Sequence, residues 1–213
     1  MVLSTHKYRL FLFLSIAGKI ESQRTFCLIK LLLPILAVLA LAQLNVISGY
    51  LVWDKSLIIN GELWRLVTGN FTHTNLPHLL MNSAALCIFS VIFKDYLNTK
   101  KLWGLLLALS VMVGSLLLLS PIERYVGLSG VLHGLFVWAA IEDIKHKRYT
   151  GWLLLLGVLA KIGWEQLFGA SASTISLINA SVATDAHLFG ALSGGMLQLC
   201  VFLVANKASD DPK

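Results

Sequence analysis

The sequence predicts an all-α membrane protein in which six helices cross the bilayer as one bundle. Of the 213 residues, 57% are hydrophobic and only 13% are charged, a balance typical of integral membrane proteins. Apolar stretches long enough to cross a hydrocarbon layer of roughly 30 Å lie at about 31–53, 77–93, 102–120, 127–141, 151–169 and 186–206. We therefore expect an N-terminal segment over 1–30, a six-helix domain over 31–206 and a short tail over 207–213.

The distribution of basic residues predicts the orientation of these helices. Lysines and arginines concentrate in the N-terminal segment and in the loops that follow the second and fourth predicted spans. Because cytoplasmic loops accumulate basic residues, we expect these loops and both termini in the cytoplasm. The net charge of +6 is then a signal of topology. No nucleic-acid partner is expected, because the basic residues lie in short loops without interleaved aromatic residues.

An apolar run over 10–17 precedes the first predicted span. It resembles the core of a signal peptide, but it is short and lacks a clear cleavage site of small residues. We expect it to be retained.

Polar residues gather at the N-terminal ends of the second, fourth and sixth predicted spans. They are His73, His78, Asn82, Ser129 and His187. The predicted topology runs all three spans from the outer face inward, so these ends should lie together near the outer face. Only about a dozen residues separate Ser129 from the acidic end of its helix, or roughly 18 Å at 1.5 Å per residue. We therefore expect Ser129 about 10 Å below the surface of the roughly 30 Å core.

This set has the composition of a serine hydrolase site. A serine hydroxyl needs a base to take its proton as the new bond forms, and His187 is the predicted base. The acid nearest to His187 in the sequence is Asp185, which we place in the external loop, so we expect a Ser129/His187 dyad. The candidate donors to the oxyanion are the His78 imidazole, the Asn82 amide and the backbone N–H groups of Ser129 and Leu128.

Glycines predict how the fourth and sixth spans approach each other. Gly130 and Gly134 lie one turn apart, and Gly190 and Gly194 repeat that spacing. Such small faces allow close helix packing in membranes. His133 lies one turn after Ser129. It is expected to stack on His187, to hold it by a hydrogen bond through water or to tune its basicity, with a plain packing role as the alternative.

Each feature also has a plain structural interpretation. A lone Ser129 could simply bond back to a helical carbonyl, and a lone His187 could be a packed interhelical histidine. Their predicted convergence with His78 and Asn82 favours catalysis. Lys161 and Glu165, four residues apart in the fifth span, are expected to pair for charge neutrality, with a polar feature near a substrate entry as the alternative.

Several motifs together resemble those of rhomboid intramembrane serine proteases. They are Glu62-Leu-Trp-Arg65, His73, His78-Leu-Leu-Met-Asn82, Gly127-Leu-Ser-Gly130 and Ala186-His187-Leu-Phe-Gly190. The resemblance implies a six-helix rhomboid-like bundle and a Ser/His dyad that needs no cofactor or metal. It also implies supporting roles for His73, Gly127, Gly130 and Gly190. His133 departs from the general rhomboid pattern, in which a tyrosine often follows the serine by one turn, and we expect it to support the site in place of that tyrosine.

The run Phe71-Thr-His-Thr-Asn75 and the Leu132-His133 pair are similar to those of rhombosortases, a bacterial subclass. That resemblance implies membrane-anchored substrates with a C-terminal transmembrane sorting tail of the GlyGly-CTERM type. It implies a location in the bacterial inner membrane, with the active site opening toward the periplasmic face.

Other functions remain as alternatives. One is a catalytically silent rhomboid-like protein that binds membrane clients; another is a channel or transporter, which the clustering of polar groups at one end disfavours. The sequence holds no phosphate-binding glycine loop, HExxH helix or paired carboxylates. Zinc at His73, His78 and His187 would leave the serine and the glycines unexplained.

Overall fold

The fold was obtained as a computed structural model, which describes residues 30–209. The predicted N-terminal segment over 1–30, with its apolar run, therefore lies almost wholly outside the described residues, as does the end of the predicted tail. The described chain begins with a helix over Lys30–Leu41. The elements that follow are α2 Asn45–Leu51, β1 Trp53–Asp54, α3 Lys55–Ile59, α4 Arg65–Thr68, η1 Gly69–Phe71, α5 Leu76–Ile92, η2 Lys94–Tyr96, α6 Thr99–Leu116, η3 Leu117–Leu119, β2 Arg124–Tyr125, α7 Ser129–Lys145, α8 Tyr149–Phe168, α9 Ala172–Ile178 and α10 Thr184–Ser209.

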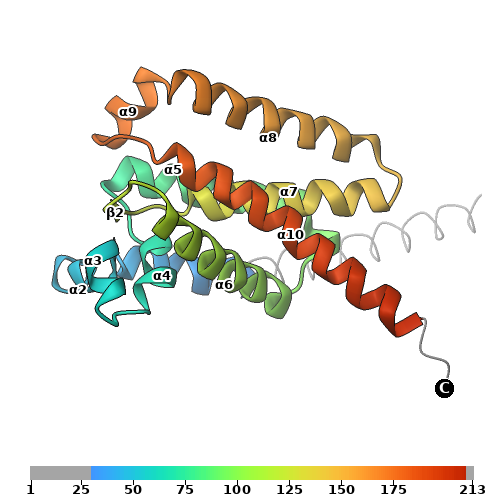
Figure 1. Cartoon of the computed structure of the whole chain (residues 1–213), viewed down its shortest axis with the longest axis horizontal. Coiled ribbons are helices and arrows are strands. Elements are labelled where there is room, and N and C mark those ends of the chain that lie inside the picture. The colour runs from blue at the N-terminus through green and yellow to red at the C-terminus, as the bar shows by residue number, and fades with distance from the viewer. Residues whose placement is uncertain (1–29, 210–213) are drawn as a thin grey trace, which may run out of the picture.

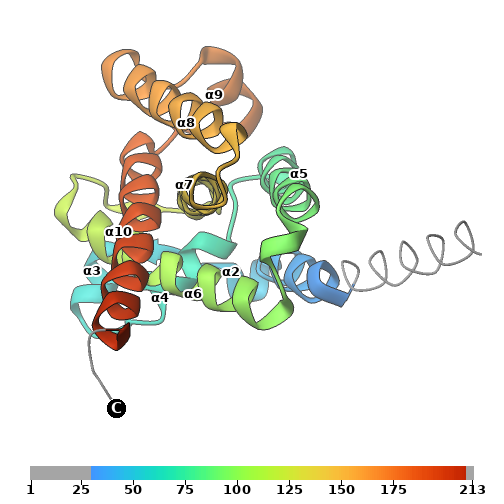
Figure 2. The same cartoon turned by 90° about the vertical axis from the view of Figure 1, so that its right-hand side faces the viewer.

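Helix α7 is the centre of the bundle. Figure 2 looks almost along α7 and shows α5, α6, α8 and α10 arranged around it, and α7 contacts all four helices, α10 most extensively. The core between the first helix, α5, α6 and α7 is built from leucines, among them Leu39, Leu86, Leu106 and Leu135, none of which is exposed. Close packing of this kind holds membrane helices together where lipid is as apolar as the side chains.

The structure supports a helical membrane bundle with three to five candidate spans. Within the described residues, α6, α8 and α10 are each long and apolar enough to cross a membrane. Two bent pairs are also long and apolar enough when each is taken as one span: Lys30–Leu41 with Asn45–Leu51, and Arg65–Phe71 with Leu76–Ile92. Helix α7 has 17 residues, fewer than the roughly 20 that cross the hydrocarbon core of a bilayer. Six spans and cytoplasmic termini therefore stay predictions.

The first predicted span, over 31–53, was wrong as a single continuous helix. The chain bends by 96° between Leu41 and Asn45. The Gln43 side chain stabilises this bend, because its amide nitrogen donates to the carbonyls of Leu39, at 2.8 Å, and Phe71, at 3.1 Å. The sequence pattern missed the bend because α2 is itself apolar and continues the hydrophobic run.

A buried arginine organises the segment between α2 and α5. Arg65 is 3% exposed, and its guanidinium donates to the carbonyls of Gly49, at 3.0 Å, and Val52, at 2.7 Å, while pairing with Glu62 at 2.6 Å. Its neighbour Trp64 is half exposed, as an anchor at a membrane interface would be. Arg65 thus holds the end of α2 against the segment before α4, which gives the Trp-Arg element a structural role.

Two short elements lie at the end of the bundle where α7 begins: the β1–β2 strand pair and helix α9. Strand β1 pairs with β2 in an antiparallel arrangement that sets Trp53 opposite Tyr125. Helix α9 connects α8 to α10 and is bonded to the start of α5, where the Asn75 amide donates to the Leu177 carbonyl at 3.0 Å. Figure 1 shows β2, α9 and the start of α10 at the same end of the molecule. Helix α10 extends past the predicted domain end at residue 206, to Ser209.

Candidate active site

Ser129 and His187 lie within hydrogen-bond distance of each other. Ser129 is the first residue of α7, and His187 lies in the first turn of α10. The Ser129 Oγ is 2.9 Å from the His187 Nε2, and the histidine is 5% exposed. This is the distance at which an imidazole takes a proton from a serine.

Glycines allow α7 and α10 to come this close. A Cβ added at Gly190 would lie 1.8 Å from the Gly130 carbonyl oxygen, and one at Gly194 would lie 2.2 Å from the Gly134 oxygen. Both distances are far below van der Waals contact, so only glycine fits. The close approach that the glycine spacing predicts is therefore present, and it lies directly beside the Ser129–His187 contact.

The other nitrogen of the histidine ring contacts a carboxylate that our sequence analysis did not place at the site. The His187 Nδ1 is 2.7 Å from the Glu165 Oε2, and Glu165 is 8% exposed. The second oxygen of Glu165 pairs with the Lys161 ammonium, which confirms the predicted pairing within α8. Asp185, the acid nearest in sequence, is not the residue on His187. The sequence offered only Asp185 as an acid near His187, whereas the structure has Glu165 beside the ring.

The signal for Glu165 was present in the sequence. An ionisable residue in an apolar span marks a functional site by default, but Lys161 four residues earlier offers a sufficient partner. Only the packing of α8 against α7 and α10 shows that the carboxylate has a second contact.

His133 stacks on His187. The two ring centroids are 4.1 Å apart and the ring planes differ by 18°. The His133 Nδ1 donates to the Ser129 carbonyl at 2.7 Å, which fixes the ring along its own helix. Stacking, one of the arrangements expected for His133, is therefore present, and it limits the directions in which the His187 ring can turn.

Asn82 and Gly127 face each other across the start of α7. The Asn82 amide nitrogen is buried and has no hydrogen-bond partner among the described residues. Gly127 has φ +124, a conformation that favours glycine, and a Cβ added there would lie 3.8 Å from that nitrogen and 2.9 Å from the His78 Nε2. Gly127 thus leaves a small space in front of two polar side chains, beside Ser129.

Helix α7 begins next to this space without a capping side chain among the described residues. Its N-cap residue, Leu128, is fully buried. The first N–H groups of a helix have no intrahelical partner, so those of Leu128 and Ser129 remain candidate donors.

The protonation of His78 is set by its neighbour Thr74. The Thr74 hydroxyl donates its one hydrogen to the Ile178 carbonyl at 2.7 Å, and the same oxygen lies 3.2 Å from the His78 Nδ1. His78 Nδ1 must then donate to Thr74. A neutral His78 therefore presents an unprotonated Nε2 toward Gly127, so Asn82 is the better placed donor of the two.

His73 contacts His78 and lines neither of the two cavities whose walls include Ser129. The rings of His73 and His78 meet edge to face, with centroids 4.9 Å apart. The His73 backbone N–H donates to the Gln43 side chain at 3.0 Å. His73 thus connects the bend in the first predicted span to the back of the site, a position suited to support.

Two cavities include Ser129 in their walls. One, of about 330 Å³, lies at the loop end of the bundle and is also lined by Arg124, Tyr125 and Thr184. Another, of about 530 Å³, lies between α5, α7 and α8, and its walls are largely apolar, with Met81, Leu132, Phe136, Leu154 and Val158 among them. Ser129 thus borders one cavity with mixed polar and apolar walls and one cavity with largely apolar walls.

His133, Glu165 and His187 also have spacing suited to a metal ion. Their ligand atoms lie within 4.8 Å of one another. Binding through His187 would break its contact with Ser129 or with Glu165, because both ring nitrogens are already paired. His73 and His78, which the sequence offers as zinc ligands with His187, are not part of this group. The arrangement suits proton transfer better than metal binding.

The site residues fall within a stretch that is similar to known proteins. Residues 60–204 match the family described as the Rhomboid domain. The chain is 29% identical over 148 residues to "Putative rhomboid protease YdcA" of Bacillus subtilis (strain 168), covering 68% of this chain and 70% of that protein. It is 29% identical over 163 residues to "Rhomboid-like protease 3" of Toxoplasma gondii, covering 71% of this chain and 55% of that protein.

Proposed function

The chain belongs to the rhomboid family, and we propose that it is an intramembrane serine endopeptidase in which Ser129 is the nucleophile and His187 the general base. The observation that carries this proposal is the 2.9 Å contact between the Ser129 Oγ and the His187 Nε2. Ser129 lies in the walls of a cavity with both polar and apolar residues and of a largely apolar cavity, which supports access for water and for a membrane-embedded peptide.

The proposed reaction follows the chemistry of serine hydrolases. The Ser129 Oγ attacks the carbonyl carbon of the scissile peptide bond as its proton passes to the His187 Nε2. The tetrahedral intermediate collapses to an acyl-enzyme, and His187 returns the proton to the leaving amine. A water molecule, deprotonated by His187, then attacks the ester and releases the new C-terminus. No cofactor takes part in these steps.

The oxyanion of the tetrahedral intermediate is expected in the space that Gly127 leaves open. The Asn82 amide nitrogen lies beside this space and has no other partner in the part of the chain that the structure describes. The backbone N–H groups of Leu128 and Ser129 and, when its Nε2 is protonated, the His78 ring complete the proposed set. Preorganised donors of this kind stabilise the charge as it develops.

Replacing Asn82 with alanine is expected to lower kcat by about 10²- to 10³-fold, the usual cost of one oxyanion donor. The KM should stay close to that of the wild type, because the oxyanion exists only in the transition state. Ser90→Ala, which changes another buried polar residue of α5, is the matched control and should retain activity. A raised KM with an unchanged kcat would instead make Asn82 part of the substrate groove.

The proposed substrates are exported proteins held in the membrane by a C-terminal transmembrane sorting tail of the GlyGly-CTERM type. The largely apolar cavity between α5 and α8 supports a substrate that enters from the lipid. The narrower choice of tail rests on the rhombosortase-like run Phe71-Thr-His-Thr-Asn75 and on Leu132-His133. The protein is a multi-pass membrane protein. The resemblance to rhombosortases supports a location in the bacterial inner membrane, and the distribution of the basic residues supports a site that faces the periplasm.

Co-expression with a tagged reporter tests this proposal. One reporter carries a GlyGly-CTERM tail and a matched reporter carries the same transmembrane segment with the two glycines replaced. We expect a shortened product only from the first reporter, and mass spectrometry of its new C-terminus gives the scissile bond. Cleavage of both reporters would support the protease and refute the sorting-tail specificity. Binding of reporter without cleavage would favour the silent client-binding alternative.

A further inference from the structure

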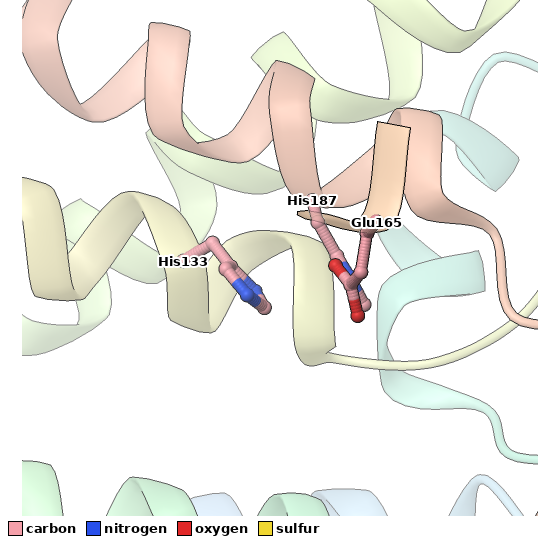
Figure 3. A group of neighbouring side chains, drawn as sticks. All are labelled: His133, Glu165 and His187. Carbon is pink, nitrogen blue, oxygen red and sulfur yellow. The ribbon is translucent and has the colours of Figure 1, made fainter. Parts of the chain in front are cut away.

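We propose that Glu165 completes a serine–histidine–glutamate triad, as the positioning residue that holds His187 in the tautomer able to accept the Ser129 proton. This inference rests on the proposed protease function. Figure 3 shows Glu165 and His187 pointing to the same place, with the ring of His133 beside them. The acid comes from α8, the base from α10 and the nucleophile from α7, so the triad would form only where the three helices meet.

The three groups are connected in the order acid, base, nucleophile. The Glu165 Oε2 lies 2.7 Å from the His187 Nδ1, and the Ser129 Oγ lies 2.9 Å from the Nε2 of the same ring. An ionised carboxylate only accepts hydrogen bonds, so this contact places the hydrogen of a neutral ring on Nδ1. The Nε2 is then the free acceptor that proton abstraction requires. The carboxylate also offsets the positive charge that His187 gains during the reaction, without itself taking the proton.

A purely structural Lys161–Glu165 pair explains less of this geometry. The Lys161 side chain is 52% exposed, whereas those of Glu165 and His187 are 8% and 6% exposed. Pairing with Lys161 uses one oxygen of Glu165 and would be possible with the carboxylate turned outward. Instead the carboxylate points into the bundle, and its second oxygen meets the ring atom that determines the tautomer.

Lys161 makes a sharp test possible. In a Glu165→Gln variant, the ammonium of Lys161 can bond only to the amide oxygen, because both the ammonium and the amide nitrogen are donors. The amide nitrogen then faces the His187 Nδ1 and donates to it. The ring hydrogen moves to Nε2, where it blocks abstraction of the Ser129 proton.

The first measurement is the rate at which a fluorophosphonate probe labels Ser129 in the purified full chain, which needs no knowledge of the natural substrate. Glu165→Gln should lower this rate by about 10²- to 10⁴-fold, as loss of the triad acid does in soluble serine proteases. Glu165→Asp keeps the carboxylate and should recover part of the rate. On the reporter, kcat should fall while KM stays within about threefold.

The second measurement is the Lys161→Met, Glu165→Gln double variant. Without Lys161 the amide is free to turn its oxygen toward Nδ1, so the double variant should label faster than Glu165→Gln alone. Nitrogen-15 NMR of ring-labelled histidine, with His187→Ala to assign the signal, should show Nδ1 protonated in the wild type and Nε2 protonated in Glu165→Gln. A structural salt bridge also predicts faster labelling in the double variant, because the double variant removes the ammonium that Glu165→Gln leaves unpaired. It predicts no movement of the ring hydrogen from Nδ1 to Nε2, so the NMR result decides between the two roles.

Glu142→Gln is the matched control. Glu142 also pairs with a lysine of its own helix, Lys145 at 3.1 Å, and it lies at the far end of α7 from Ser129. This variant should label at the wild-type rate.

A chelator separates the triad from a metal site built from the same residues. With a triad, labelling should not change when the chelator is added. Loss of labelling that recovers on adding zinc would make Glu165 a metal ligand and overturn the triad.

The outcomes distinguish the two proposals. If the wild type does not label at Ser129, both the protease function and the triad fail. If the wild type labels and Glu165→Gln labels equally fast, the protease stands as a dyad and the triad is refuted. Equal losses in Glu165→Gln and Lys161→Met, each with a lowered unfolding temperature, would reduce Glu165 to a structural role.

Discussion

Replacing Ser129 with alanine is expected to abolish cleavage of the reporter in reconstituted membranes. Removing the nucleophile of a serine protease lowers kcat by about 10⁶-fold. Bilayer-embedded peptide bonds are also poorly exposed to water, so no useful background reaction should remain. The measurement is single-turnover cleavage in proteoliposomes, with the unfolding temperature recorded for each variant.

The change His187→Ala should have nearly the same effect, and the double variant should be no slower than either single one. Such non-additivity is what two residues acting as one unit produce. Ser193→Ala is the control: Ser193 is a buried serine of α10 that donates to the Phe189 carbonyl at 2.7 Å, away from the proposed chemistry. Residual cleavage in Ser129→Ala above the rate of empty vesicles would point to another nucleophile.

Replacing Gly190 with alanine is expected to disable the enzyme through packing alone. The new Cβ would lie 1.8 Å from the Gly130 carbonyl oxygen, so α7 and α10 must move apart. Overpacking of this kind costs typically 1 to 3 kcal/mol of stability. A displacement of about 1 Å at the reacting groups costs about 10²-fold in rate. We expect both a lowered unfolding temperature and a kcat/KM reduced by at least that factor.

Gly195→Ala on the same helix is the matched control with the opposite expectation. A Cβ added at Gly195 meets no atom within 4 Å, and alanine favours a helix over glycine by about 1 kcal/mol. This variant should therefore keep its activity and be as stable as the wild type or more so. Wild-type activity in Gly190→Ala would contradict the backbone contact between α7 and α10.

Much of the fold and of the proposed catalytic pair follows from local patterns. Long apolar runs predict helices where α5 to α8 and α10 are found, because a backbone in lipid must satisfy its own hydrogen bonds. The topology predicts that the starts of α5, α7 and α10 converge, and His78, Ser129 and His187 line the same cavity. The 96° bend after the first helix escaped prediction because it depends on Gln43 reaching the segment before α5, a contact between residues far apart in the chain.

The sequence by itself determined the membrane class, the positions of the long helices α5 to α8 and α10, and the candidate pair Ser129 and His187. Hydrophobic length, charge distribution and motif spacing can all be read along the chain. Only the tertiary structure decided which carboxylate meets the histidine. Asp185 is two residues from His187 in the chain, whereas Glu165 lies on another helix, and its side chain reaches the ring because α8 packs beside α7 and α10. This contact depends on how side chains fill the space between the helices, and the residues around Glu165 in the chain do not say which helix its carboxylate meets.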